Sequence, residues 1–305
     1  MALLLAACSS GTEGSASASP SAGQYPGWPG SGTVVANTDF IPILVNTELG
    51  VGHGRVIIEL RDSAGRSLST PELSTQVAFY DLGASTTTPS STVSGTFRWL
   101  IPGSKAVYMA VAEFDHAGDW GMEVTGRSAG EPDQTARVTF SVRATTATPA
   151  IGAVAPPSAT LTAGDASALA AISTDEDPDP AFYSLSVKDA IAAGKPFVVV
   201  FATPLFCASG TCGPALDQVK QISPAYVGRV NFVHVEPYLL QVEDGRTQPA
   251  VDVLGHPQPV RAVLEWGLPT EPYVFVVDGQ GKVAAKFEGM AYPDELTAAL
   301  DAVLR

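Results

Sequence analysis

Cysteine, basic residues and long apolar segments are all scarce in this chain. Three cysteines among 305 residues make any closely spaced pair informative. Lysine and arginine number 17 against 31 acidic residues, and the net charge is −14. This balance argues against nucleic-acid binding, because contacts to phosphate need clustered Lys and Arg side chains. After residue 8 no apolar segment is long enough to cross a bilayer, so the composition is compatible with an exported, soluble body.

The first eight residues, MALLLAAC, end in one of the three cysteines. The Leu-Ala-Ala-Cys segment that ends at Cys8 resembles the lipobox of bacterial lipoproteins. This resemblance implies cleavage before Cys8, lipid on its thiol, and a protein anchored to the cell membrane outside the cytoplasm. The apolar run is too short to span a bilayer and lacks a basic segment before it. An apolar tag that happens to end in cysteine is the alternative.

Changes in composition divide the rest of the chain into four segments. Residues 9–32 are rich in Ser, Gly, Ala and Pro and are predicted to form a disordered tether. Residues 33–142 hold short alternating apolar runs. Residues 143–180 are rich in Pro, Thr, Ala and acidic residues, which is typical of an extended, partly stiff linker. Residues 181–305 alternate strand and helix patterns, so two folded domains are predicted.

The segment 33–142 predicts an all-β sandwich. Its alternating runs are separated by Gly- and Asp-containing turns and show almost no helical periodicity. Residues 108–124 resemble the end of a small immunoglobulin-like sandwich of exported bacterial proteins. That resemblance implies a hairpin made of a strand, a glycine-containing turn and a strand that bears Trp120. The predicted strands are 55–60, 76–80, 107–113 and 136–142.

Several residues of this segment have two possible roles. Trp99 and Trp120 are interpreted as core aromatics, with a binding groove as the alternative. His53 and His116 lack nearby Cys or paired His, so turn or surface positions are favoured over metal binding. The polar stretch 84–95 is predicted to be a mobile loop.

In residues 181–305 the elements follow a β-α-β half, then a β-hairpin and a closing helix. An entirely apolar strand is expected where helices cover both faces of a sheet. The Asp-Gly-Gln-Gly segment at 278–281 is a strong hairpin signal. The predicted elements are a helix at 186–194, strands at 197–201 and 230–235, helices at 214–222, 260–266 and 292–304, an irregular insertion at 237–259, and strands at 273–277 and 283–287.

Cys207 and Cys212 lie between the strand 197–201 and the helix that follows it. A helix N-terminus stabilises a thiolate, so this place favours thiol chemistry. The segment Thr-Cys-Gly-Pro that contains Cys212 is similar to the start of the Cys-Gly-Pro-Cys motif of thioredoxin-like proteins. Residues 267–278 look like the family segment in which a cis-proline faces the cysteines, with Pro272 as the first candidate and Pro269 as the second. The resemblance therefore implies an α/β thioredoxin-like domain behind the β-sandwich.

Two departures from the family pattern bear on mechanism. The family's second cysteine would fall at Ala215, and the partner is instead Cys207, upstream, in a Cys-x4-Cys arrangement. The buried acid that the family often carries on the strand before the motif is missing, since residues 198–200 are all valine. A four-residue gap with Ser and Gly still lets two Cα atoms approach within disulfide reach.

Three functional interpretations remain open. In the first, the chain is a thiol-disulfide oxidoreductase that acts on thiols or disulfides of exported proteins and needs no cofactor. Cys212 is then the thiolate and Cys207 the resolving thiol, or the reverse, and Pro272 presents backbone to the substrate. In the second, both cysteines and His234 or His256 bind copper, which resembles thioredoxin-like copper chaperones. In the third, a Cys207–Cys212 disulfide only staples a loop of a surface lipoprotein.

Overall fold

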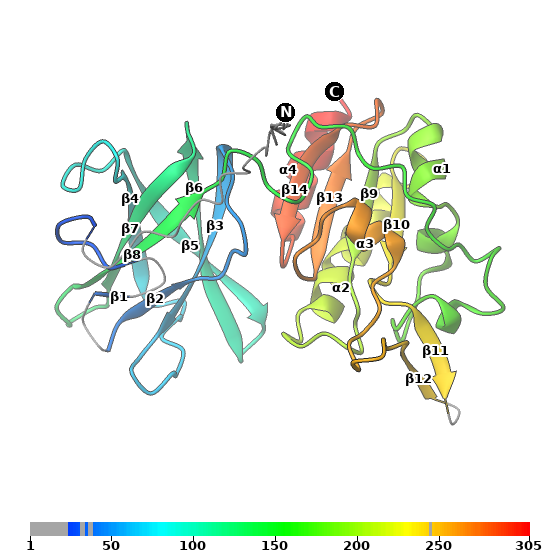
Figure 1. Cartoon of the computed structure of the whole chain (residues 1–305), viewed down its shortest axis with the longest axis horizontal. Coiled ribbons are helices and arrows are strands. Elements are labelled where there is room, and N and C mark those ends of the chain that lie inside the picture. The colour runs from blue at the N-terminus through cyan, green and yellow to red at the C-terminus, as the bar shows by residue number, and fades with distance from the viewer. Residues whose placement is uncertain (1–23, 31–33, 36–38, 244–245) are drawn as a thin grey trace, which may run out of the picture.

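The computed structural model describes residues 24–305 except 31–33, 36–38 and 244–245. The predicted signal and lipidation site at Cys8 lie outside the described residues. An all-β part and a part that mixes helices with strands lie side by side (Figure 1). No helix of the described chain is long and apolar enough to cross a membrane.

The all-β part is built from eight strands in two sheets that share one strand. Residues 91–95 of β5 pair with β4, and residues 96–101 pair with β6, so β5 passes from one sheet to the other. The strand order is β1-β8-β7-β4-β5-β6-β3-β2, and one apolar core lies within this arrangement. This fold is consistent with an immunoglobulin-like β-sandwich, as the sequence predicted. The strands are β1 (Val34–Val35), β2 (Ile41–Leu44), β3 (Gly52–Arg61), β4 (Ser74–Asp81), β5 (Ser91–Ile101), β6 (Lys105–Phe114), β7 (Gly118–Arg127) and β8 (Gln134–Val142).

Two predictions for this part are wrong. The hairpin predicted over residues 108–124 does not form, because β6 pairs with β3 and β5 whereas β7 pairs with β4 and β8. The connection between β6 and β7 therefore crosses from one sheet to the other. The loop predicted at 84–95 ends earlier than expected, because residues from Ser91 onward belong to β5. Serine and threonine fit a strand when its partners supply the packing.

The segment before the first strand is attached to the sandwich, although residues 9–32 were predicted to form a tether. Trp28 is only 4% exposed, and its ring packs edge-on against Tyr80. Its indole N–H donates to the carbonyl of Thr86 over 2.9 Å. A Cβ at Gly121 would lie 2.4 Å from the Trp28 ring, so this position requires glycine. Residues 24–30 thus belong to the folded body.

The linker predicted at 143–180 also packs on folded structure. Gly152 N–H donates to the carbonyl of Val283 over 2.7 Å, and Val283 N–H donates to that of Ala153 over 2.9 Å. The chain therefore covers the free edge of β14. Ala155 and Ile172 are buried in the core of the second part. A proline-rich composition does not show whether the edge of a sheet lies alongside the segment.

The second part contains a four-stranded sheet in the order β10-β9-β13-β14. β9 runs parallel to β10, and β13 runs antiparallel to both β9 and β14. The elements are η1 (Leu169–Ala171), η2 (Pro180–Tyr183), α1 (Val187–Ala192), β9 (Phe197–Phe201), α2 (Cys212–Ile222), η3 (Ser223–Tyr226), β10 (Asn231–Val235), β11 (Leu240–Glu243), β12 (Arg246–Pro249), α3 (Arg261–Glu265), β13 (Tyr273–Val277), β14 (Val283–Glu288) and α4 (Pro293–Val303).

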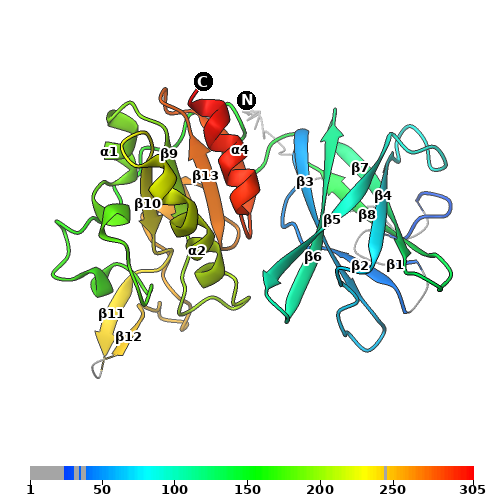
Figure 2. The same ribbon diagram turned by 180° about the vertical axis from the view of Figure 1, so that it is seen from behind.

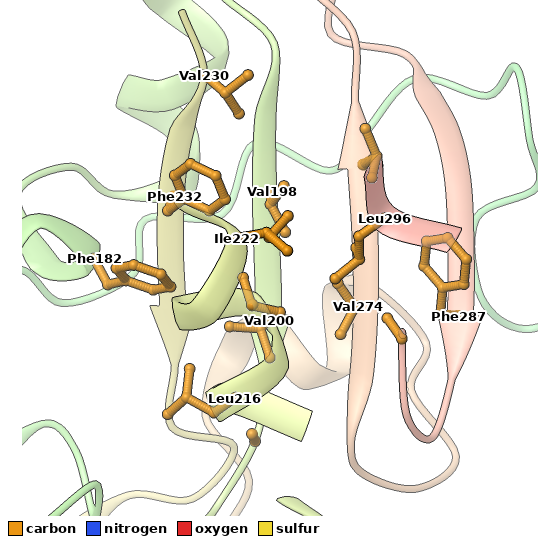
Figure 3. Packing of buried hydrophobic residues seen from close by; sticks show 14 of the residues in the cluster. Phe182, Val198, Val200, Leu216, Ile222, Val230, Phe232, Val274, Phe287 and Leu296 are labelled. Atoms are coloured by element: carbon orange, nitrogen blue, oxygen red, sulfur yellow. The ribbon is translucent and has the colours of Figure 1, made fainter. Parts of the chain in front are cut away.

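Helices cover both faces of this sheet, as the uniformly apolar strand 197–201 predicted. Side chains of β9 alternate between the two faces, and all five are fully buried. On the face of α2 and α4, seen in Figure 2, Val198 and Val200 share a core with Leu216 and Leu296. Figure 3 shows α2 lying over β9 and β10 on this face. On the other face, Phe197, Val199 and Phe201 share a core with residues of α1 and α3.

The insertion predicted to be irregular at 237–259 contains a β-hairpin. β11 and β12 pair antiparallel and form a separate two-stranded sheet. The hairpin projects from the second part beyond the end of the main sheet (Figure 1). Each strand is only four residues long, and β12 lacks the apolar alternation that identifies a strand in a sequence.

Hydrogen bonds, ion pairs and apolar contacts join the two parts. Arg55 of β3 donates from Nε and Nη2 to the two carboxylate oxygens of Glu295 in α4, over 2.7 and 2.9 Å. The same guanidinium also donates to the carbonyls of Glu288 and Met290. A buried cluster adds apolar contact between the parts. It comprises Ile57, Val107 and Met109 of the sandwich and Ala215, Met290 and Tyr292 of the second part.

Candidate thiol site

The strand register brings three chain segments together at one end of the four-stranded sheet. Phe201, the last residue of β9, pairs with Val235 at the end of β10 and with Tyr273 at the start of β13. The residues just beyond these pairs therefore meet at the same edge. They are the cysteine loop after β9, Glu236 after β10, and the Glu271–Pro272 pair before β13.

Both cysteines lie at this edge and carry free thiols. Cys212 is the first residue of α2 and is fully buried. Cys207 lies in the preceding loop and is partly exposed. The backbone N–H of Cys212 donates to Sγ of Cys207 over 3.3 Å, which places the Cys207 sulfur at the N-terminus of the helix. Of the two sulfurs, that of Cys207 is therefore the more accessible.

Hydrogen bonds stabilise Cys207 as a thiolate. The Cys212 thiol, the Ser209 hydroxyl and the backbone N–H groups of Cys212 and Thr211 lower the pKa of Cys207 to about 4, against the opposing effect of burial. The Ser209 Oγ lies 3.1 Å from Sγ of Cys207 and 2.7 Å from the Thr211 hydroxyl. A thiolate is the nucleophilic form of cysteine, so these hydrogen bonds favour the reactive form of Cys207.

Cys212 has the opposite character. Its hydrogen bond to Cys207 and its burial raise the pKa of the Cys212 thiol far above the ordinary range, although a backbone contact from Thr203 opposes the shift. The sequence left two assignments open, and the first places the low-pKa thiolate at Cys212, at the helix N-terminus. The geometry does not favour Cys212, which is buried at the helix N-terminus, while the partly exposed Cys207 receives its N–H group. The reversed assignment, left open by the sequence, fits the geometry.

Two acids and a tyrosine near the thiols were missed in the sequence. Burial raises the pKa of Glu236 to about 7, although its Oε2 accepts hydrogen bonds from the N–H and hydroxyl of Thr174 over 2.9 and 2.7 Å. Burial also raises the pKa of Glu271, whose Oε1 accepts from the Tyr238 hydroxyl over 3.2 Å. Electrostatic effects couple Glu271 to both Cys207 and Cys212. Residues 198–200 supply no acid, as the sequence showed, whereas the ends of the neighbouring strands do.

The signal that identifies these acids is their position. Glu236 directly follows an apolar strand, and Glu271 lies two residues before another. Both are the first acidic residues beyond strands that flank β9 in the sheet. A sequence gives these positions, but only the strand order shows that they meet.

Glu236 is expected to make stability depend on pH. Its folded-state pKa of about 7 lies above the ordinary value of 4.5, so the folded state favours the protonated acid. Its contribution to stability is therefore present at low pH and is lost as the pH rises between these values. We expect Glu236→Gln to remove about 2 kcal/mol of the decrease in unfolding free energy between pH 5 and pH 8. Urea unfolding at both pH values measures this, with the exposed Glu176→Gln as control. Parallel pH profiles of wild type and Glu236→Gln would contradict the shift.

The other residues predicted from the sequence for the thiol or copper site are Pro272, His234 and His256. The Glu271–Pro272 peptide bond is cis, as predicted for Pro272 rather than Pro269. His234 is buried, and its ring nitrogens lie 2.8 Å from the Tyr183 hydroxyl and from the carbonyl of Ala202. His256 is exposed beside Asp252. In the described parts of the chain, no three His, Cys, Asp or Glu side chains are grouped as metal ligands.

The aromatic and histidine candidates of the sandwich lie in its core, at the interface with the second part, or on exposed positions. Trp120 is a core residue, 2% exposed, as interpreted from the sequence. Trp99 is 38% exposed, which differs from the core position expected for it, and its carbonyl accepts from the Tyr292 hydroxyl across the interface. His53 and His116 are exposed and contact neighbouring carboxylates over 2.6 Å.

Comparison with known proteins gives little further information. The chain matches no protein-family model, and no curated protein sequence matches it significantly. Among solved structures, the crystal structure of the Lin-41 filamin domain is similar over 37% of this chain and 92% of that chain. The two are 18% identical, with a TM-score of 0.20. A score this low supports no assignment, so the description of the sandwich rests on its own strand pairing.

Proposed function

We propose that residues 181–305 form a thioredoxin-like domain that exchanges thiols and disulfides with exported proteins through Cys207 and Cys212. The observation that carries the proposal is the pair of unlike thiols. Cys207 is partly exposed, accepts the backbone N–H of Cys212 and has a pKa lowered to about 4, whereas Cys212 is buried and has a raised pKa. The sheet order, the helix that begins at Cys212 and the position of Pro272 support the fold assignment. The proposal includes a lipid anchor on Cys8, which mass spectrometry of the mature protein tests.

The proposed exchange uses each thiol once. The Cys207 thiolate attacks one sulfur of a client disulfide, forms a mixed disulfide and releases the other client sulfur as a thiolate. Cys212 then loses its proton, attacks Sγ of Cys207 and releases the second client thiolate. Two electrons pass to the client, which leaves as a dithiol, while Cys207 and Cys212 become a disulfide. The reverse sequence oxidises a client dithiol.

Glu271 is proposed as the group that accepts the Cys212 proton. Its charge acts on both sulfurs, and burial raises its pKa towards the range in which a carboxylate exchanges protons near neutrality. Formation of the mixed disulfide removes the negative charge of Cys207. That loss makes ionisation of Cys212 easier, because two adjacent thiolates repel each other.

Single-turnover exchange with a model protein disulfide tests the proposal and the role of Glu271. We expect Glu271→Gln to leave the first attack by Cys207 unchanged and to slow the second step by roughly tenfold to hundredfold, so that the mixed disulfide accumulates. Acid quenching followed by mass spectrometry separates the two steps. Glu176→Gln, which removes an exposed carboxylate, is the matched control. Resolution at the wild-type rate in Glu271→Gln would remove Glu271 from the mechanism, and absence of exchange in wild type would overturn the function.

A further inference from the structure

The sandwich reaches the cysteine loop directly. At the start of β6, the ammonium group of Lys105 donates to the carbonyl of Ser209 in the cysteine loop over 2.6 Å. A Cβ placed at Gly210 would lie 3.7 Å from Cδ1 of Ile101, which is ordinary van der Waals contact. Lys105 of the β-sandwich is therefore hydrogen-bonded to the loop that contains the Cys207 sulfur.

The contacted residue is one that acts on Cys207. Ser209 places its hydroxyl 3.1 Å from Sγ of Cys207, and its carbonyl accepts from Lys105. Ala208, Ser209 and Gly210 are exposed, so packing within the second part holds this stretch weakly. A contact from outside the loop therefore influences how often the loop adopts the conformation in which Cys207 accepts its hydrogen bonds.

The sandwich is firmly attached where this contact is made. Ala215, one helical turn beyond Cys212, is fully buried beneath Val107 and Met109 of β6. Arg55 and Arg98 of the sandwich form ion pairs with Glu295 and Asp294 of α4. Lys105 therefore lies on a surface of the sandwich that packs against the second part. The same docking covers position 215, where the thioredoxin pattern places its second thiol, so a cysteine there would be enclosed by the interface.

We propose that the sandwich is part of the thiol site and that Lys105 is a positioning residue, which acts through Ser209 to hold the cysteine loop in its thiolate-stabilising conformation. This inference rests on the proposed function, because it concerns the same sulfur. The titratable and charged groups that face Cys207 or its loop are Cys212 of α2, Tyr238 before β11, Glu271 before β13 and Lys105 of β6.

Alkylation of Cys207 by iodoacetamide in the full chain, followed from pH 3 to pH 9, tests the inference. We expect Lys105→Met to raise the pH midpoint of Cys207 alkylation by about one unit, since the hydrogen bonds to its sulfur are then made less often. Lys195→Met is the matched control. Lys195 also donates to a backbone carbonyl, that of Gly228, at the opposite end of β9. Its replacement should leave the midpoint unchanged.

The outcomes separate this inference from the proposed function. An unchanged midpoint in Lys105→Met, or an equal shift in Lys195→Met, would overturn the role of Lys105 while leaving the exchange chemistry intact. A wild-type midpoint in the range of an ordinary thiol would instead overturn the low-pKa nucleophile and, with it, the proposed function. A shift confined to Lys105→Met supports a sandwich that contributes to the site.

Discussion

Cys207→Ser is expected to abolish disulfide exchange, whereas Cys212→Ser is expected to attack a client disulfide once and remain bound to it. The reason is the difference in access and ionisation of the two thiols. Cys207 is partly exposed and receives the N–H of Cys212, while Cys212 is fully buried. Loss of the resolving thiol leaves the mixed disulfide without an internal attacker. Gel electrophoresis without reductant and mass spectrometry detect the trapped adduct.

The adduct distinguishes the roles of the two cysteines. It should form at Cys207 in Cys212→Ser and be absent in Cys207→Ser and in the double variant. Serine is close in size to cysteine, so the fold should be retained in all three proteins. Adducts at Cys212 in Cys207→Ser, formed as fast as those at Cys207, would contradict the assignment.

A second large effect is expected in the pH dependence of thiol reactivity. An ordinary thiol gains about tenfold in alkylation rate for each pH unit below its pKa of about 8.5, so its rate rises roughly a thousandfold from pH 5 to pH 8. Cys207, with a pKa lowered to about 4, is already ionised at pH 5 and should change less than about twofold. Cys212 should stay unreacted until the chain unfolds, because it is buried and its pKa is raised. Quenched labelling with mass spectrometry of each cysteine-containing peptide measures both rates.

The unfolded chain provides the reference for this measurement. In urea both cysteines should react at the same rate and with the steep pH dependence of a free thiol. A thousandfold rise for Cys207 in the folded protein would show that its surroundings do not stabilise the thiolate. Equal labelling of Cys212 in the folded state would show that this thiol is not enclosed.

The sequence predicted the elements whose residues carry strong local signals. The apolar run 197–201 identified a strand buried on both faces, and the Asp-Gly-Gln-Gly segment correctly predicted that β13 and β14 pair as a hairpin. Helices were placed within a few residues at α1, α2, α3 and α4. These features depend on neighbouring residues, which a sequence displays directly.

Features that depend on tertiary contacts could not be predicted in the same way. The sheet to which β7 belongs depends on long-range pairing, so a hairpin was predicted where the chain crosses between sheets. Residues 24–30 and 143–180 have the composition of tethers, yet Trp28 and Ile172 find buried places on surfaces formed by distant residues. Glu236 and Glu271 lie near the thiols only because β10 and β13 flank β9.

The cysteine pair has some features that the sequence displays and others that depend on tertiary contacts. Its position between a strand and a helix, and the placement of Cys207 upstream of Cys212, were evident from the residues. Which sulfur becomes the thiolate depended on the direction of one N–H group, that of Cys212, and on the burial of its side chain. The contact from Lys105 had no local signal at all, because it comes from another part of the chain.

The proposed function requires Cys207 and Cys212 to form a reversible redox pair in the folded protein. Its most direct test is equilibration of the full chain with glutathione or dithiothreitol buffers, read out by mass spectrometry and near-ultraviolet circular dichroism. We predict a two-electron transition at a potential between about −270 and −120 mV, the range of thiol oxidoreductases, with the folded signal retained throughout. A disulfide that resists reduction until the protein unfolds, or one that never forms between these cysteines, would show that they are not a reversible redox pair.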